Sequence, residues 1–149
     1  MLGRTYEALD CPVARALELV GERWSLLILR DGLFSGITRF GDFQRSLGLA
    51  TNILSARLDG FVASGLMERR RGAGHPEHYE YVLTDKSRSL LPAVLALAAW
   101  GQEWVAPDGL ALDFEHCGCD GVAHVNTACT SCGQDLGVTD VNAHARLKA

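Results

Sequence analysis

Residues 39–71 read RFGDFQRSLGLATNILSARLDGFVASGLMERRR, and two helical patterns follow one another in this stretch. The first places its large apolar residues on one helical face, and Gly48 is expected to end it because glycine interrupts helices. The second begins near Thr51 and is expected to end at Gly65, since glycine readily adopts the left-handed conformation of a helix C-cap. The stretch therefore predicts two short helices joined by a tight turn.

The residues that follow Gly65 no longer show a helical period. Residues 66–71 and 78–84 bracket a segment at 72–77 that contains turn-forming glycine and proline, and this order is typical of a β-hairpin. A helix, a turn, a second helix and a basic hairpin together indicate a winged helix-turn-helix. The predicted fold class is therefore mainly α with a small β-hairpin wing (α+β), followed by a small Cys/His-rich C-terminal appendage.

Two longer helical patterns flank this centre. Over residues 12–29 apolar residues recur every three or four positions, as in an amphipathic helix, which Gly21 is expected to loosen or split. Residues 90–105 are apolar on more than one side of a helix. Such a helix must bury more than one face, and in a domain of this size a second subunit can cover the remaining face. The pattern therefore predicts a homodimer.

Composition places the chain among folded, water-soluble proteins. Its 149 residues are 48% hydrophobic and 21% charged, which fits one domain with a small appendage and excludes a disordered chain. The longest apolar run, at residues 90–100, is interrupted by Pro92 and is too short to span a membrane. No secretory signal is readable in residues 1–20, so we expect a cytoplasmic protein.

Charge is distributed unevenly along the chain. The net charge is −4, yet residues 1–105 are balanced and the whole acidic excess lies in residues 106–149. Within the balanced part, residues 36–75 hold six arginines against three acidic residues, a local charge of +3. A basic patch on a neutral domain favours a partner that carries phosphate groups.

A winged helix-turn-helix with a basic patch is typical of proteins that bind double-stranded DNA. A short helix fits the major groove, where polar side chains read base edges, and a basic hairpin lies along the neighbouring backbone or minor groove. The alternative is that these residues form a solvated helix face and a charged edge that prevents aggregation. The candidate DNA-binding residues are Arg39, Gln44, Arg45, Thr51, Asn52, Ser55, Arg57, Arg69, Arg70, Arg71, His75 and His78.

Several short segments between residues 9 and 105 occur in an order that is specific in combination: CPV at 11–13, AL at 16–17, GERWSLLILR at 21–30, RFGDF at 39–43, LSARL at 54–58 and SGLMER at 64–69. In these segments the sequence resembles the HxlR-type winged-helix transcriptional regulators of bacteria, which are related in architecture to the MarR group. The resemblance implies a homodimer that binds a pseudo-palindromic operator and dimerises through the first and last helices of the domain. Family members usually carry a serine where this chain has Ala50, so Thr51 is expected to cap the following helix instead.

The acidic tail contains four of the five cysteines. His116 and Cys119 are separated by two residues, as are Cys129 and Cys132, and two such pairs suit a tetrahedral Zn²⁺ site of the Cys₃His type. Cys117 offers a Cys₄ variant, and a disulfide is the alternative to a metal. The resemblance also implies zinc, because the longer family members often carry a similar tail.

Proline, aspartate and glycine at 107–109 mark a linker. We therefore predict a winged helix-turn-helix DNA-binding and dimerisation domain over residues 1–106 and a zinc-ribbon-like tail over residues 107–149. The fifth cysteine, Cys11, lies at the predicted start of a helix, where partial positive charge favours the thiolate and its reaction with oxidants. It is interpreted either as a redox sensor, as in some members of the resembled family, or as a small buried apolar residue.

No pairing of a nucleophile with a base and no phosphate-binding glycine loop occurs in the sequence, so we do not expect an enzyme. The predicted function is a homodimeric DNA-binding transcriptional regulator that responds to a redox or small-molecule signal. The alternative is a winged-helix interaction module that docks a partner through its zinc tail or its apolar helix, without affinity for DNA.

Overall fold

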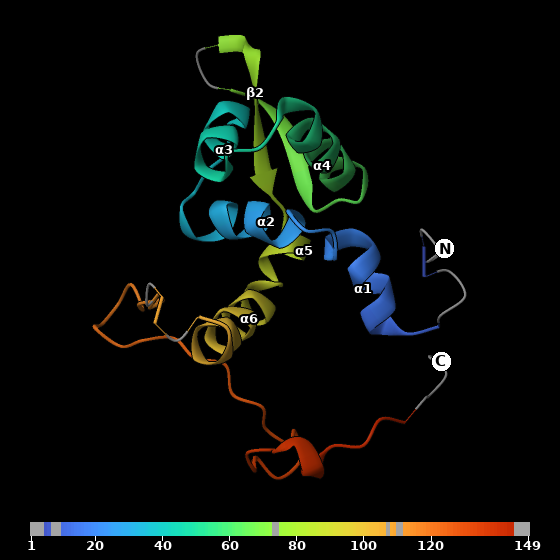
Figure 1. Ribbon diagram of the computed structural model, residues 1–149, viewed down its shortest axis with the longest axis vertical. Coiled ribbons are helices and arrows are strands. Elements are labelled where there is room, and N and C mark those ends of the chain that lie inside the picture. Colours follow the sequence, from blue (N-terminus) through green and yellow to red (C-terminus); the bar gives the residue numbers. More distant parts are fainter. Residues whose placement is uncertain (1–4, 7–9, 73–74, 107, 110–111, 145–149) are drawn as a thin grey trace. The chain divides into compact units, whose positions relative to one another are not determined.

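The computed structural model describes residues 5–6, 10–72, 75–106, 108–109 and 112–144. The chain forms two compact units, Met1–Val94 and Leu95–Ala149, and each is considered by itself. Figure 1 follows the chain through its helices and strands. The predicted boundary between residues 106 and 107 involves a residue outside the described ranges, and it stays a prediction.

The first unit has the predicted winged helix-turn-helix fold. Helices precede and follow an antiparallel two-stranded hairpin, and the last helix continues into the second unit, where a single 3-10 turn is described. In chain order the elements are α1 (Pro12–Val20), α2 (Ser25–Phe34), α3 (Phe40–Leu47), α4 (Thr51–Ala63), β1 (Met67–Gly72), β2 (His75–Leu83), α5 (Asp85–Arg88), α6 (Leu91–Trp104) and η1 (Val138–Asp140).

The helical pattern of residues 12–29 forms two helices, because Gly21 ends the first of them. The Gly21 N–H donates to the Leu17 carbonyl oxygen over 2.8 Å, and a Cβ at position 21 would lie 2.6 Å from that oxygen. A residue with a side chain would therefore force the backbone to shift. α2 begins four residues later, at Ser25.

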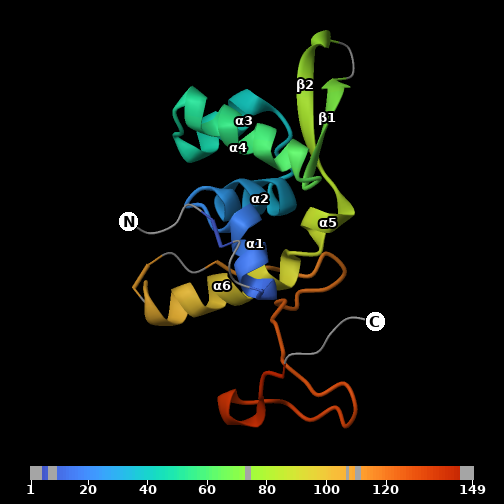
Figure 2. The ribbon, with the colours of Figure 1, turned by 90° about the vertical axis from the view of Figure 1, so that its right-hand side faces the viewer.

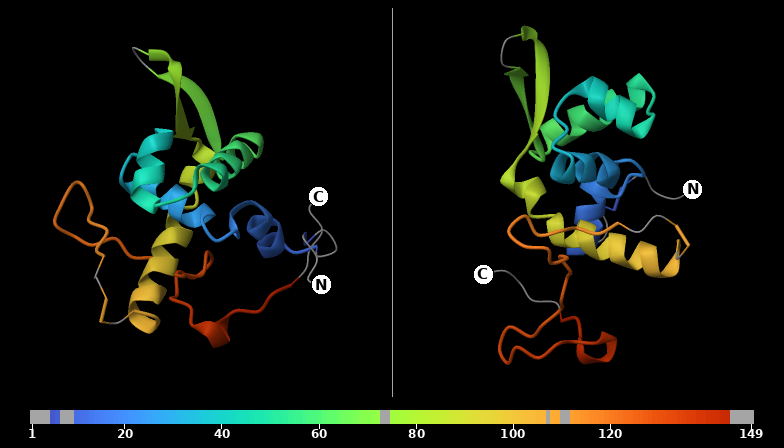
Figure 3. Two further views of the ribbon diagram at one scale, coloured as in Figure 1. Left: turned by 45° about the horizontal axis from the view of Figure 1, so that its top comes forward. Right: turned by 90° about the vertical axis from the view of Figure 1, so that its left-hand side faces the viewer.

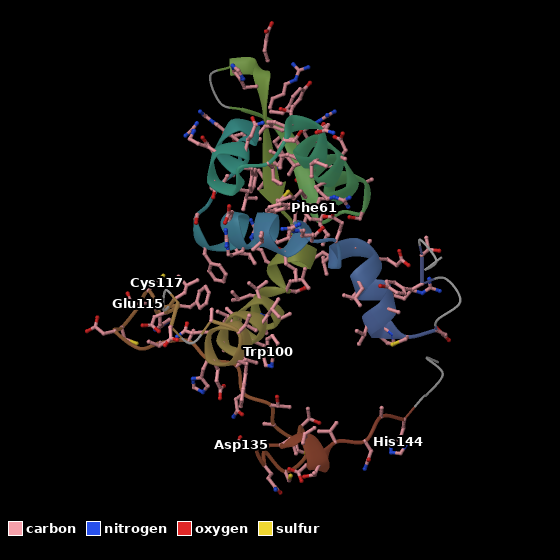
Figure 4. The ribbon with its side chains drawn as sticks, in the orientation of Figure 1. Phe61, Trp100, Glu115, Cys117, Asp135 and His144 are labelled. Atoms are coloured by element: carbon pink, nitrogen blue, oxygen red, sulfur yellow. The ribbon has the colours of Figure 1, made fainter. Side chains whose placement is uncertain are left out.

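The core of the first unit lies between α2, α3, α4 and the base of the hairpin. Ile28 and Leu29 of α2, Phe43 of α3 and Leu58 of α4 have no exposed surface. Phe61 of α4, which Figure 4 labels, is 3% exposed and belongs to the same cluster. Burying each side chain of this size stabilises the fold by about 2 kcal/mol. Rotating α4 about its axis would expose its buried residues, so the core determines which face of α4 is open to solvent.

The hairpin is joined to the helices at its base and projects beyond them (Figures 2 and 3). The Tyr81 N–H of β2 donates to the Thr38 carbonyl oxygen, just before α3, over 2.7 Å. The Thr84 hydroxyl donates to the Gly65 carbonyl oxygen, just after α4, over 2.7 Å. These bonds couple the position of the hairpin to both helices of the helix-turn-helix. β2 begins at His75, earlier than the predicted start at residue 78.

The predicted last helix is present as α6, with the short helix α5 before it. Pro92 is accommodated because it lies in the first turn of α6, where a backbone donor is not needed. Val94 is the buried residue of α6, and most of its other apolar side chains are at least partly exposed. Within the part of the chain that the structure describes, no helix combines the length and the apolar content needed to cross a membrane.

Candidate nucleic-acid interface

The turn between α3 and α4 is held by Gln44, which the sequence placed among the DNA-contacting residues. Gly48 ends α3 in the left-handed conformation with φ of 63°. The Gln44 side-chain amide then donates to the Leu49 carbonyl oxygen over 3.2 Å and to Thr51 Oγ1 over 2.9 Å. The side-chain amide of Gln44 therefore stabilises the turn between α3 and α4.

The N-cap of α4 is Ala50, so the expectation that Thr51 caps this helix is wrong. Ala50 has extended backbone angles and makes no side-chain capping bond, whereas Thr51 is already the first helical residue. The Thr51 hydroxyl accepts the hydrogen bond from Gln44. The start of α4 is thus fixed by a side chain of α3 and lacks a cap of its own.

One face of α4 lies open to solvent along its first two turns. Leu54 and Leu58 are fully buried against the core. Thr51, Asn52 and Ile53 are exposed, as is Ala56, while Ser55 is half-buried. The amino-terminal part of a recognition helix is the part that meets base edges. Of the four candidate DNA-binding residues on α4, Thr51 and Asn52 are therefore open to solvent and Ser55 is partly so, and their role in reading bases stays a prediction.

Arg57, the fourth predicted reading residue, has a partner within the protein. Its Nε lies 3.1 Å from Glu22 Oε2, and the side chain is 36% exposed. The same Glu22 oxygen accepts a hydrogen bond from the Trp24 backbone over 3.1 Å. Arg57 thus ties α4 to the turn between α1 and α2.

Arg39 lies directly before α3, and Arg45 lies in the last turn of this helix. Arg39 is the N-cap residue of α3, and its Nε lies 3.6 Å from Glu80 Oε1 on β2. Arg45 pairs with Asp42 over 3.1 Å and is 80% exposed. Both arginines line a shallow hollow of about 460 Å³ together with the carboxylate of Asp42 and with serine and threonine residues, so that two positive charges face one negative charge there. This arrangement suits a phosphate group of the DNA backbone.

The three arginines of the hairpin differ in how far their charges are compensated by neighbouring groups. Arg70 donates from Nε and Nη2 to Glu68 Oε2, at 2.9 and 2.6 Å. The guanidinium of Arg69 lies 4.7 Å from the centre of the Tyr79 ring. Arg71 is exposed, and no ion pair among the described residues involves it. Arg71 is therefore the hairpin arginine whose charge is least compensated.

The hairpin also carries two histidines, His75 and His78, both on β2. His78 is exposed on β2. His75 belongs to β2 by its backbone, but its side chain lies outside the described part of the structure. Its predicted role in DNA binding therefore stays a prediction.

The second unit places its predicted metal ligands in two tight turns. In the first, His116 Nδ1 lies 3.2 Å from Cys119 Sγ. A Cβ at position 118 would lie 2.9 Å from the His116 ring, and one at position 121 would lie 3.3 Å from Cys119 Sγ. Glycine at both positions therefore leaves room for the two side chains. Cys117 is exposed.

The second turn gathers hydrogen bonds on the sulfur of Cys129. The backbone N–H of Cys132, the backbone N–H of Ser131 and the Cys132 thiol all lower the pKa of the Cys129 thiol. Gly133 closes the turn with φ of 72°, and its N–H donates to the Cys129 carbonyl oxygen over 2.8 Å. Hydrogen bonds of this kind favour the thiolate that a metal requires.

The first pair has the separation of two neighbouring zinc ligands, but the four predicted ligands are not gathered. Zinc bonds of about 2.0 to 2.3 Å separate neighbouring ligand atoms by roughly 3.5 Å, close to the distance between His116 and Cys119. Among the described residues, however, no group of three or more His, Cys, Asp and Glu side chains is arranged to hold a metal. Figure 4 labels Cys117 in the first turn and Asp135 just after the second. The predicted four-ligand site is therefore not assembled.

Cys11 lies at the position predicted for it. It is the N-cap residue of α1, with Pro12 as the first helical residue, and its side chain is exposed. The alternative interpretation, a small residue buried in the core, is therefore wrong.

The comparisons with known proteins agree with this geometry. The model of the HxlR-like helix-turn-helix family matches residues 19–109. The chain belongs to the HxlR-like helix-turn-helix family. It is 42% identical to Rv3095 of Mycobacterium tuberculosis (strain ATCC 25618 / H37Rv), named an uncharacterized HTH-type transcriptional regulator, over 87% of this chain and 82% of the relative.

Two solved structures extend the similarity of this HxlR-like protein to three dimensions. The crystal structure of PA1607 aligns with a TM-score of 0.83 and 39% identity, over 92% of this chain and 96% of the other. The reduced form of the redox regulator HypR aligns with a TM-score of 0.57 and 27% identity, over 66% of this chain and 100% of the other. The family of this chain is thus one of transcriptional regulators, and its similar proteins are named as such.

Proposed function

We propose that this HxlR-like protein is a homodimeric transcriptional regulator that reads a pseudo-palindromic operator with α4. The observation that carries the proposal is the open face of α4, on which Thr51 and Asn52 are exposed and Ser55 is half-buried at its edge. A basic hairpin is joined to the base of this helix, as a wing over the DNA backbone requires. Arg39 and Arg45 supply further positive charge beside α3.

The experiment that tests this proposal is selection of duplexes from a random-sequence DNA library by the full-length protein. The duplex that the wild type binds most tightly is called the selected duplex below. If the proposal is correct, the selection yields two inverted half-sites with centres about one helical turn, roughly 34 Å, apart. A library that shows no enrichment contradicts it.

Dimerisation is proposed because α1 and α6 both expose apolar side chains. Val13 and Leu17 of α1 are 66% and 43% exposed, and Trp100 and Trp104 of α6 are 55% and 68% exposed. Tryptophans are prominent among residues that anchor interfaces. A second copy of the chain is proposed to cover these faces, and the dimer would then carry two α4 helices for the two half-sites of the operator.

The wing is expected to bind phosphate groups chiefly through Arg71. Replacing it with alanine (Arg71→Ala) should weaken binding to all duplexes alike and reduce the slope of log affinity against log salt concentration by about 1 per protomer. Fluorescence anisotropy in a salt series measures both quantities. Arg70→Ala is the matched control and should change the slope less, because Arg70 is already paired with Glu68. Equal slopes for the Arg71 variant and the wild type would show that Arg71 does not bind a phosphate group.

A response to oxidants is proposed to act through Cys11. HypR is named a redox regulator, and Cys11 is exposed at the amino terminus of α1. With hydrogen peroxide, the Cys11 thiolate attacks one peroxide oxygen, which forms a sulfenic acid and releases hydroxide. We expect affinity for the selected duplex to change about tenfold on oxidation and to return with dithiothreitol. The Cys11→Ser variant keeps every tail cysteine and should show no such change; an equal response would place the sensor elsewhere.

Zinc is proposed as a structural group of the tail, held by His116, Cys119, Cys129 and Cys132. A metal that takes all four ligands would draw the two turns together, since each supplies two of the four. The free side chain of Cys117 remains the alternative to His116. In this role zinc would contribute folding free energy to the tail and no chemical step.

A further inference from the structure

Ile53 occupies an unusual position on α4. It is the third residue of the helix and is 39% exposed, although its neighbour Leu54 is fully buried. A single exposed apolar residue is ordinary on a protein surface. Ile53, however, lies between Asn52 and Ala56 on the open face of the helix that is proposed to enter the major groove.

The open face of α4 continues from Ile53 with small residues. Ala56 follows one turn later and is exposed, and a Cβ added at Gly60, a further turn along, would meet no atom within 4 Å. The rise between Ile53 and Ala56 is about 4.5 Å, similar to the base step of about 3.4 Å. The face therefore offers one large apolar group followed by small residues, and the long side chain nearest to it, Arg57 one turn along, is held by its ion pair with Glu22.

The chemistry of the major groove supplies one apolar partner for such a group. Thymine carries a C5-methyl group there, whereas every other distinguishing group on the base edges is a hydrogen-bond donor or acceptor. Asn52, next to Ile53, is of the type that pairs with adenine. Arg57 is of the type that pairs with guanine, but it is held by Glu22.

We propose that Ile53 is a specificity-determining residue, which contacts a thymine C5-methyl group and so selects an A·T pair in each half-site. The inference rests on the proposed function, because it assigns one base contact within the proposed DNA interface. It gives Asn52 and Ile53 a shared preference for A·T pairs. The contact would bury the methyl group and exclude water from it, which cytosine or uracil at the same position cannot reproduce.

The test replaces thymine by deoxyuridine in the selected duplex, one position at a time. Deoxyuridine keeps the Watson–Crick pair and every hydrogen-bonding group and removes only the methyl group. We expect one position in each half-site at which wild-type affinity falls about fourfold, and about fifteenfold when both half-sites are changed. At that position the Ile53→Ala variant should bind thymine and deoxyuridine equally.

Ile53→Val is the matched control, because valine retains two methyl groups on an exposed position and should keep part of the discrimination. If no deoxyuridine position changes wild-type affinity, the inference is overturned while the proposed function stands. If Ile53→Ala discriminates as well as the wild type, another residue contacts the methyl group and the inference is again overturned. If no duplex is enriched in the selection, the proposed function itself fails, and the inference fails with it.

Discussion

A protein with Trp100→Glu is expected to be a monomer and to bind the selected duplex about 100-fold or more weakly than the wild type. Trp100 is 55% exposed on α6, so its replacement removes little from the core of one chain. A carboxylate in an apolar interface must lose its water without gaining a partner, which disfavours association. Loss of the dimer leaves one α4 per binding event, and the gain from linking two binding sites is typically 10² to 10⁴.

Analytical ultracentrifugation gives the oligomeric state, and anisotropy gives the affinity. The matched control is Glu103→Gln on the same helix, which also changes the charge by one but leaves the apolar face intact; Glu103 is exposed. It should remain dimeric and bind as the wild type does. A Trp100→Glu protein that is still dimeric would place the dimer interface elsewhere, and one that is monomeric yet binds with full affinity would contradict the paired-helix arrangement.

Loss of zinc is the second large effect that we expect. Protein purified in reducing buffer without chelator should contain about one zinc per chain, and the double variant Cys129→Ser, Cys132→Ser should contain none. Structural zinc in small domains is bound with about 10 kcal/mol or more at pH 7, so half of a ligand set cannot retain it through dialysis. Elemental analysis by mass spectrometry measures the metal directly.

Cys117→Ser is the control that separates the two ligand sets. It should retain zinc, because His116 and not Cys117 lies beside Cys119. Treatment of the wild type with a strong chelator should make Cys119, Cys129 and Cys132 reactive toward iodoacetamide. A metal-free wild type that is 2 Da lighter than its reduced form would instead indicate a disulfide, and it would overturn the zinc proposal.

The fold could be predicted because its signals are local in sequence. Gly48 and Gly65 end two helices, and both adopt the left-handed conformation in the structure. The loss of the helical period after Gly65, with turn-forming glycine and proline at 72–77, indicated the hairpin. Gly21 was expected to loosen or split one helix, and the contact that a Cβ there would make with Leu17 explains why it separates two.

The candidate site was predicted less completely, because ion pairs join residues that are distant in sequence. Arg57 is held by Glu22, and Arg39 by Glu80, so residue type alone did not reveal how far each charge is compensated. Gln44 looked like a phosphate contact but bonds to the turn that follows its own helix. In the tail, the spacing of histidine and cysteines indicated two turns with one candidate ligand pair each, but spacing alone does not show whether the two turns come together around one metal.

Ile53 was not among the predicted site residues, because any isoleucine in an amphipathic pattern is first assigned to the core. A signal was nevertheless present. Leu54, Leu58 and Phe61 already form a complete buried stripe with helical spacing, and Ile53 falls outside it. An apolar residue that lies outside the buried stripe of a recognition helix is therefore a candidate for contact with a base.

Whether this HxlR-like protein reads DNA sequence can be measured by fluorescence anisotropy in a salt series. The reduced, metal-loaded wild type is titrated against the selected duplex and against a scrambled duplex of the same composition. We expect tight binding to the selected duplex alone, with affinity that falls about 10³-fold or more between 50 and 200 mM salt. Equal affinity for both duplexes, or no affinity for either, would contradict this expectation and would favour an interaction module that uses the winged-helix fold without reading DNA.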